Sequence, residues 1–188
     1  QSSLLSSFFA SEDAYKFLTW GHMGGLALGG APGGPISAAK EENMDLLSST
    51  IGLDLIVEAQ EKDVGPFRAD ILCKDYASNN MVLIENQLEK TDHKHLGQLL
   101  TYATGLKAVT IIWIASEFND EHRATLDWLN DITDENYNFF GIIVELYKIG
   151  DSNIAPNFKI VSKPNNWSKS VSTAKSKIQN EDLGETKL

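Results

Sequence analysis

The sequence contains a single cysteine, Cys73, among its 188 residues. One cysteine excludes an internal disulfide framework and is typical of proteins in a reducing cytoplasm, which is the localisation we expect. No apolar run approaches the roughly 20 residues that a bilayer-spanning helix needs, so no membrane association is expected. Cys73 stands inside a predicted strand, where a buried core side chain is a better interpretation than a nucleophile.

Positive charge is also scarce, because 16 Lys and Arg residues face 26 Asp and Glu residues, for a net charge of −10. Proteins that hold DNA through its phosphates usually present a basic face, so this balance argues against tight nonspecific binding. Net charge does not describe local patches, however, and Lys90, Lys94 and Lys107 lie close in sequence to the acids discussed below. A divalent cation would also neutralise part of the charge of a carboxylate cluster. The acidity therefore does not exclude a nucleic-acid partner.

Composition divides the chain into three segments. Residues 1–37 include the Gly- and Pro-rich stretch 21–35, which shows no periodicity and is expected to be flexible. Part of this arm is expected to be foreign, since Gly21-His22-Met23 resembles a cloning scar. Residues 38–167 carry the periodic patterns of one folded domain, and residues 168–188 are expected to be a polar tail.

The folded segment alternates strand and helix patterns. Strands are predicted where apolar residues alternate or run unbroken between turn residues, at 53–60, 68–74, 81–87, 109–115, 139–149 and 158–161. Helices are predicted at 37–50, 93–104 and 120–130, with Ser37 and either Thr91 or Asp92 as N-caps, and with Gly52 and Gly105 as stops. The order of helix, three-strand meander, helix, strand, helix and strand predicts an α/β fold with a mixed central sheet flanked by helices.

Two acids are embedded in apolar strand sequence, where an unpaired carboxylate is costly to bury. Asp70 stands in RADIL, and Glu85 follows Val-Leu-Ile in the next predicted strand. Neighbouring strands joined by a hairpin can bring both side chains to one end of the sheet, where Mg²⁺ is a natural partner and the Asn86 carbonyl could add a ligand. Gln87 is expected on the same face as Glu85, because side chains alternate along a strand. The alternative is that both acids are ordinary salt-bridge or strand-end residues.

Asp70, followed by Glu85-Asn86-Gln87 at the end of the next strand, resembles the D…(D/E)-x-K signature of the PD-(D/E)XK nuclease superfamily. This resemblance implies a restriction-endonuclease-like core in which the two acids hold Mg²⁺ or Mn²⁺. In the family the third residue, usually Lys, orients or polarises the attacking water. Here that position is Gln87, which can only position water by hydrogen bonds. Lys90 could replace the missing cation if its long stem reaches back to the site.

A second motif stands on the helix that follows. Gln98 and Tyr102 match the Q-x-x-x-Y motif of the RecB-like branch of this superfamily. Positions four apart share a helix face, and His95 lies three residues before Gln98 on that face. In relatives this face lines the site and contacts metal-bound groups or the nucleic-acid backbone. The alternative is a solvated Gln98 with Tyr102 packed in the core. The stretch 42–167 further resembles a family of uncharacterised bacterial proteins assigned to this fold.

The remaining candidates are weaker. The helix-borne acid that the superfamily often supplies could come from Glu41 or Glu42, or be replaced by Glu58 or Glu61. Three further expectations concern the histidines and tryptophans. Asp92 with His93 and His95 is better interpreted as a polar helix start than as a zinc site, because alternate positions on a helix splay apart. His122 is expected to be solvated, and Trp113, Trp128, Phe139 and Phe140 are expected in the core.

The sequence therefore predicts a Mg²⁺-dependent (or Mn²⁺-dependent) phosphodiesterase acting on DNA, by resemblance to nucleases of this fold. The assigned roles are metal ligation by Asp70, Glu85 and Asn86, water orientation by Gln87, phosphate or water positioning by Gln98 and Tyr102, and nucleic-acid attraction by Lys90, Lys94 and His95. A binding or regulatory module that has lost hydrolysis is the alternative. A two-carboxylate glycosidase fits less well, because it needs acids across an open cleft. A homodimer is expected by analogy alone.

Overall fold

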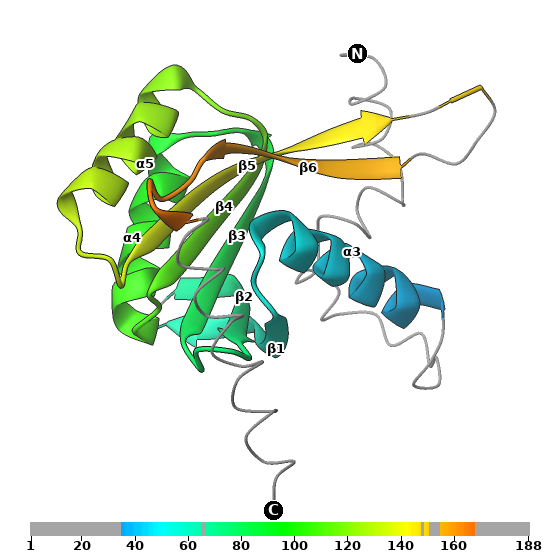
Figure 1. Ribbon diagram of the computed structural model, residues 1–188, viewed down its shortest axis with the longest axis horizontal. Helices are drawn as coiled ribbons and strands as arrows, with labels where there is room; N and C mark the ends of the chain where they lie inside the picture. Colours follow the sequence, from blue (N-terminus) through cyan, green and yellow to red (C-terminus); the bar gives the residue numbers. More distant parts are fainter. Residues whose placement is uncertain (1–34, 65–66, 148, 151–154, 168–188) are drawn as a thin grey trace, which may run out of the picture.

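The computed structural model describes residues 35–64, 67–147, 149–150 and 155–167 (Figure 1). Most of the expected N-terminal arm and all of the expected tail 168–188 lie outside these residues. The helices are α3 (Pro35–Ile51), α4 (His93–Leu106) and α5 (Asp120–Ile132). The strands are β1 (Leu55–Val64), β2 (Phe67–Asp75), β3 (Met81–Lys90), β4 (Thr110–Glu117), β5 (Asn138–Tyr147) and β6 (Ala155–Ser162).

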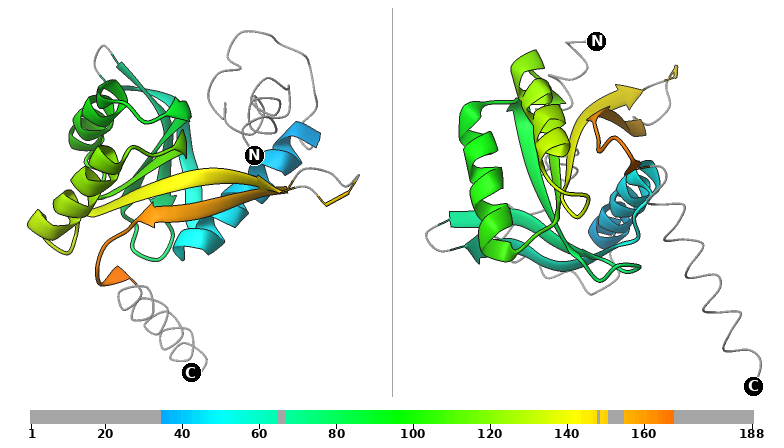
Figure 2. Two further views of the ribbon diagram at one scale, coloured as in Figure 1. Left: turned by 90° about the horizontal axis from the view of Figure 1, so that it is seen from above. Right: turned by 60° about the vertical axis from the view of Figure 1, so that its left-hand side comes forward.

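The described strands form one mixed sheet in the order β1-β2-β3-β4-β5-β6. Strands β1, β2 and β3 form an antiparallel meander, β3, β4 and β5 run parallel, and β6 pairs antiparallel with β5. Helices α4 and α5 supply the crossovers that the parallel strands require. Both cover one face of the sheet, whereas α3 lies on the other face (Figure 2). The expected fold class, a mixed central sheet flanked by helices, is confirmed.

The alternation of side chains along β3 defines the two layers of the core. Val82 and Ile84 point into the layer with α3, where Leu47 is fully buried, and Leu83 points into the layer with α4 and α5. Glu85 and Gln87 continue the series of Leu83, since side chains two apart share a face. Both polar residues therefore lie on the α4 and α5 side of the sheet.

The ends of several elements differ from the prediction, and each difference has a local cause. Strand β3 continues to Lys90, which pairs with β4, so the expected connection after 87 is shorter than predicted. Helix α4 passes through Gly105 to Leu106, which packs against the core, and the left-handed residue that ends it is Lys107 (φ 54°). Ser37 lies inside α3 rather than capping it. Helix α3 does end before Gly52, whose φ is 78°, as predicted.

One expected core residue lies at the surface. Trp128 is 57% exposed, whereas Trp113 and Phe140 are fully buried. The buried residues of α5 are His122 and Leu126, which stand one turn apart on the face that packs against the sheet. Trp128 follows Leu126 by two positions and therefore points to the opposite side of the helix.

Candidate functional site

Asp70 and Glu85 lie side by side on β2 and β3, as predicted. The pairing of Ile71 with Ile84 places the two acids opposite each other in the antiparallel register. The Asp70 backbone N–H donates to Glu85 Oε1 (3.3 Å), and the Asn86 backbone N–H donates to Asp70 Oδ2 (2.8 Å). Glu85 is only 6% exposed and Asp70 is half-buried, so the two carboxyl groups meet where the sheet is partly covered.

The environment of Glu85 opposes its ionisation. Burial, and next the negative charge of Asp70, raise the pKa of Glu85, the hydrogen bond from the Asp70 backbone partly offsets both, and the net result is a pKa raised from the ordinary 4.5 to about 8. Two adjacent carboxylates of this kind need either a proton or a cation between them. Within the described residues, no cluster of three or more His, Cys, Asp or Glu side chains could bind a metal. A cation here would keep much of its water, as Mg²⁺ commonly does.

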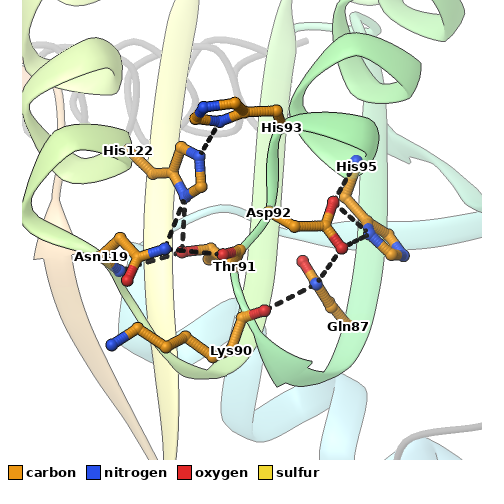
Figure 3. Close-up of polar contacts among 8 residues, drawn as sticks. All are labelled: Gln87, Lys90, Thr91, Asp92, His93, His95, Asn119 and His122. Atoms are coloured by element: carbon orange, nitrogen blue, oxygen red, sulfur yellow. Dashed lines mark hydrogen bonds and ion pairs between the residues drawn. The ribbon is translucent and has the colours of Figure 1, made fainter.

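Gln87 lies next along the same face and is 4% exposed. Its Nε2 donates to the Lys90 carbonyl oxygen (2.8 Å) and to Asp92 Oδ2 (3.0 Å) (Figure 3). Its Oε1 is buried and has no hydrogen-bond partner among the described residues. A flipped amide would place Oε1 against two acceptors, so the hydrogen-bond network fixes which atom is the oxygen. Gln87 therefore presents a buried acceptor on the face that carries Glu85.

Asp92 connects Gln87 to helix α4. It is the N-cap residue, and Oδ1 accepts from the His95 backbone N–H (2.8 Å). His95 Nδ1 lies 2.9 Å from each carboxylate oxygen (Figure 3). Burial alone would raise the pKa of Asp92, but the hydrogen bonds from the backbone and ring of His95 lower it below its usual range. Asp92 is therefore an ionised acceptor at neutral pH.

The predicted nucleic-acid-binding residues are separated by the structure. Lys90 forms an ion pair with Glu117 through its ammonium group, which in Figure 3 points away from Gln87. Among the described contacts, Lys90 meets Gln87 through its backbone carbonyl, and its role as a substitute for the missing lysine stays a prediction. Lys94 is exposed on the first turn of α4, and the neighbouring His95 side chain is 30% exposed.

The two residues of the Q-x-x-x-Y motif differ in burial. Tyr102 is 2% exposed and packs in the core layer with Leu99 and Ala103, as the packing alternative predicts. Gln98 is half-buried on the same helix. Helix α4 packs against β3, on the sheet face that carries Glu85. Their roles in positioning a phosphate stay predictions.

The candidates for a helix-borne acid are not brought to the site by any described contact. Glu58 is exposed on β1, and its negative charge acts on Cys73, whose pKa burial raises to about 12. Cys73 is fully buried, which confirms the core interpretation. The side chains of Glu41, Glu42 and Glu61 lie outside the described residues.

A contact between the buried His122 and the exposed His93 was not predicted. His122 is 2% exposed, so the expectation that it is solvated is wrong. Its Nε2 lies 2.6 Å from His93 Nδ1, and its Nδ1 lies 2.8 Å from Thr91 Oγ1 (Figure 3). The ring also packs on Trp113, which stands opposite Glu85 in the parallel register and whose Nε1 has no partner among the described residues. The spacing of His122 and Leu126 by four residues was the sequence signal of this burial.

His122 gives the protein a testable pH dependence. Burial and the nearby charge of His93 lower the pKa of His122, although Asp92 and Glu121 act in the opposite direction. The contribution of neutral His122 to the free energy of unfolding is therefore fully present above the unfolded pKa of about 6.5. It is lost as the pH falls below that value toward the lower pKa of the folded state, because protons then bind the unfolded state more tightly. His122→Gln should cost about 1–3 kcal/mol at pH 8 through its lost hydrogen bonds, and less at pH 5.5. Urea unfolding of both proteins at the two pH values measures this difference, and an equal cost at both would contradict it.

No protein-family model matches the chain, and no curated protein sequence matches it. Among solved structures, the chain is similar to the crystal structure of a repair endonuclease from Pyrococcus abyssi, with 18% identity and a TM-score of 0.39. The likeness covers 48% of this chain and 42% of that chain, so this chain spans less than half of the endonuclease's length. A likeness of this extent assigns neither a family nor an activity. In the described part of the chain, no helix has the length and apolarity to cross a membrane.

Proposed function

We propose that the protein is a metal-dependent nuclease that hydrolyses phosphodiester bonds in DNA, and that it belongs to the PD-(D/E)XK superfamily. The observation that carries the proposal is the buried Glu85 beside the half-buried Asp70, an arrangement in which burial and the neighbouring charge raise the pKa of Glu85 to about 8. Packing alone gives no reason to bury one carboxyl group against a second. A site that binds a divalent cation does give a reason.

The residues present fit Mg²⁺ or Mn²⁺. Asp70 and Glu85 offer carboxylate oxygens and Asn86 offers its backbone carbonyl, while Gln87 Oε1 is a buried acceptor with no donor among the described residues. When bound, the cation would supply an acidified water and charge neutralisation at the scissile phosphate. Position 87 carries glutamine where the superfamily usually has lysine, so no lysine at that position would transfer a proton.

The chain's own residues would then orient the reactants. Gln87 Oε1 would accept a hydrogen bond from the attacking water, which aims a lone pair of that water at phosphorus. Gln98 and Tyr102 would position the phosphate from the adjacent helix. Lys94 and His95 would attract the nucleic-acid backbone at the start of α4, whereas the charge of Lys90 is already balanced by Glu117.

The test is cleavage of supercoiled plasmid DNA in Mg²⁺ by the wild type and by Asp70→Asn. We expect the variant to lose at least about 100-fold in rate, since removal of a carboxylate ligand exceeds the 10–100-fold cost of disturbing an outer-shell partner. Asp120→Asn is the matched control, because Asp120 is an exposed acid at the start of α5. Equal cleavage by Asp70→Asn and the wild type would assign the activity to another site or to a contaminant.

A catalytically degenerate nucleic-acid-binding or regulatory module of the same fold is the second candidate. Gln87 in place of lysine, the ion pair that occupies Lys90 and the net charge of −10 favour it. Calorimetric binding of Mn²⁺ without turnover of duplex, single-stranded or branched DNA would support this module over the nuclease. The expected homodimer is a separate proposal, which light scattering of the purified protein tests.

A further inference from the structure

The orientation of the Gln87 side chain is set from outside the acidic pair. Both hydrogens of its Nε2 have an acceptor, one at the Lys90 carbonyl and one at Asp92 Oδ2. The first acceptor is backbone and exists with any residue at position 90. The second is a carboxylate, which is acceptor-only when ionised. Only the second acceptor depends on the identity of a side chain.

We infer that Asp92 is a positioning residue that holds Gln87 with its carbonyl oxygen as a buried acceptor on the sheet face of Glu85, where that oxygen takes the attacking water. The group at the position of the family's lysine thus accepts a hydrogen bond instead of donating one. The role of the attacking water as hydrogen-bond donor to Gln87 Oε1 rests on the proposed function, whereas the orientation of the amide does not.

His95 completes this arrangement by fixing Asp92. The His95 backbone N–H donates to Asp92 Oδ1 (2.8 Å), and the ring Nδ1 lies 2.9 Å from both Oδ1 and Oδ2, while Oδ2 also accepts from Gln87 Nε2. The backbone N–H and the ring of His95 therefore hold the whole carboxylate in the direction in which Oδ2 meets the Gln87 amide. The chain from His95 through Asp92 to Gln87 joins helix α4 to the strand that carries Glu85 (Figure 3).

Asp92→Asn separates this role from helix capping. Asn is as good an N-cap as Asp, so its oxygen can still accept from the His95 backbone. Its amide nitrogen would then face Gln87 Nε2, and two donors would oppose each other. Gln87 must give up one of its two hydrogen bonds or turn its nitrogen toward the site. The matched control is Asp134→Asn, because Asp134 Oδ1 also accepts a backbone N–H, from Asn136, on an exposed turn.

The orientation is measured by NMR of the Gln87 side-chain amide in the cation-free protein. In the wild type we expect both Nε2 hydrogens to exchange at least about 100-fold more slowly than those of the exposed Gln60. In Asp92→Asn at least one should exchange about tenfold faster than in the wild type, and in Asp134→Asn neither should change. Exchange of the wild-type Gln87 amide as fast as that of Gln60 would overturn the inference.

The role in the reaction is measured by cleavage kinetics. Asp92→Asn should lower kcat by about 10–100-fold while Mn²⁺ affinity and KM for DNA stay within about twofold, because an outer partner is altered and the ligands are not. An unchanged kcat would overturn the positioning role. Absence of metal-dependent cleavage in the wild type would overturn the proposed function and, with it, the role of Gln87 Oε1 as acceptor for the attacking water. The hydrogen-exchange experiment would still test the orientation of the Gln87 amide.

Discussion

Glu85→Gln is expected to stabilise the cation-free protein above pH 7 and to abolish its binding of Mn²⁺. The physical reason is the cost of ionising Glu85, which is 6% exposed and adjacent to Asp70. A rise in pKa from 4.5 to about 8 sets an upper limit of roughly 5 kcal/mol on that cost. Relaxation of the site reduces it, so we expect a gain of about 2–4 kcal/mol at pH 9.

The sign of the pH dependence follows from the raised pKa of Glu85. Its contribution to stability is complete below the ordinary value of 4.5 and is lost as the pH rises through about 8. Gln is neutral at every pH, can still accept from the Asp70 backbone through its oxygen, and offers a donor to the Asp70 carboxylate. The variant should therefore lack this loss, which is opposite in sign to the effect of His122.

The measurement is urea unfolding in EDTA at pH 5, 7 and 9, followed by calorimetric titration of Mn²⁺ at pH 8. Glu89→Gln is the control, since Glu89 is an exposed acid on the same strand. The control should change neither the slope of stability with pH nor the binding of Mn²⁺. A Glu85→Gln protein that is less stable than the wild type at pH 9 would show that the carboxylate is stabilised by partners other than a cation.

The affinity of the wild type for Mn²⁺ is expected to rise about tenfold for each pH unit between pH 6 and pH 8, and then to level off. A metal ligand must be deprotonated, and the pKa of Glu85, about 8, means that binding at lower pH displaces a proton. The expected total is about 100-fold across this range, with close to one proton released at pH 6.

Calorimetry in two buffers of different ionisation enthalpy measures both the affinity and the proton release. A competing exposed site of ordinary carboxylates would show little change above pH 6, because such groups are already ionised there. Affinity that is constant from pH 6 to pH 8 would therefore place the bound Mn²⁺ away from Glu85. Asp134→Asn should behave as the wild type does.

The acidic pair could be predicted from the sequence because its geometry is local. A hairpin between two strands fixes which residues face each other, and the spacing of Asp70 and Glu85 suits that register. The alternation of side chains likewise placed Gln87 on the face of Glu85. Asp92 was one of two predicted N-caps, since short polar residues before an apolar helix pattern carry that signal.

The surroundings of the pair could not be predicted, because they depend on contacts between distant segments. Lys90 is paired with Glu117 across two strands, and His122 meets Thr91 and His93 across two helix starts. No periodicity in either segment specifies such a partner. The hydrogen bond from Gln87 to Asp92 is close in sequence, but it requires β3 to continue to Lys90, beyond the predicted end of that strand.

The Asp92 carboxylate accepts hydrogen bonds both from His95 on α4 and from Gln87 on β3. The lifetime of the oriented Gln87 amide is therefore linked to the fraying of helix α4. The first turn of any helix opens more readily than its middle, since its N–H groups lack partners within the helix. Each opening of the α4 start would withdraw His95 from Asp92 and free the carboxylate from its fixed direction. The lifetime of the oriented Gln87 amide is then limited by the closed lifetime of one helical turn. Under the proposed function, bound DNA that contacts this turn would lengthen that lifetime, and the substrate would then stabilise the orientation of Gln87.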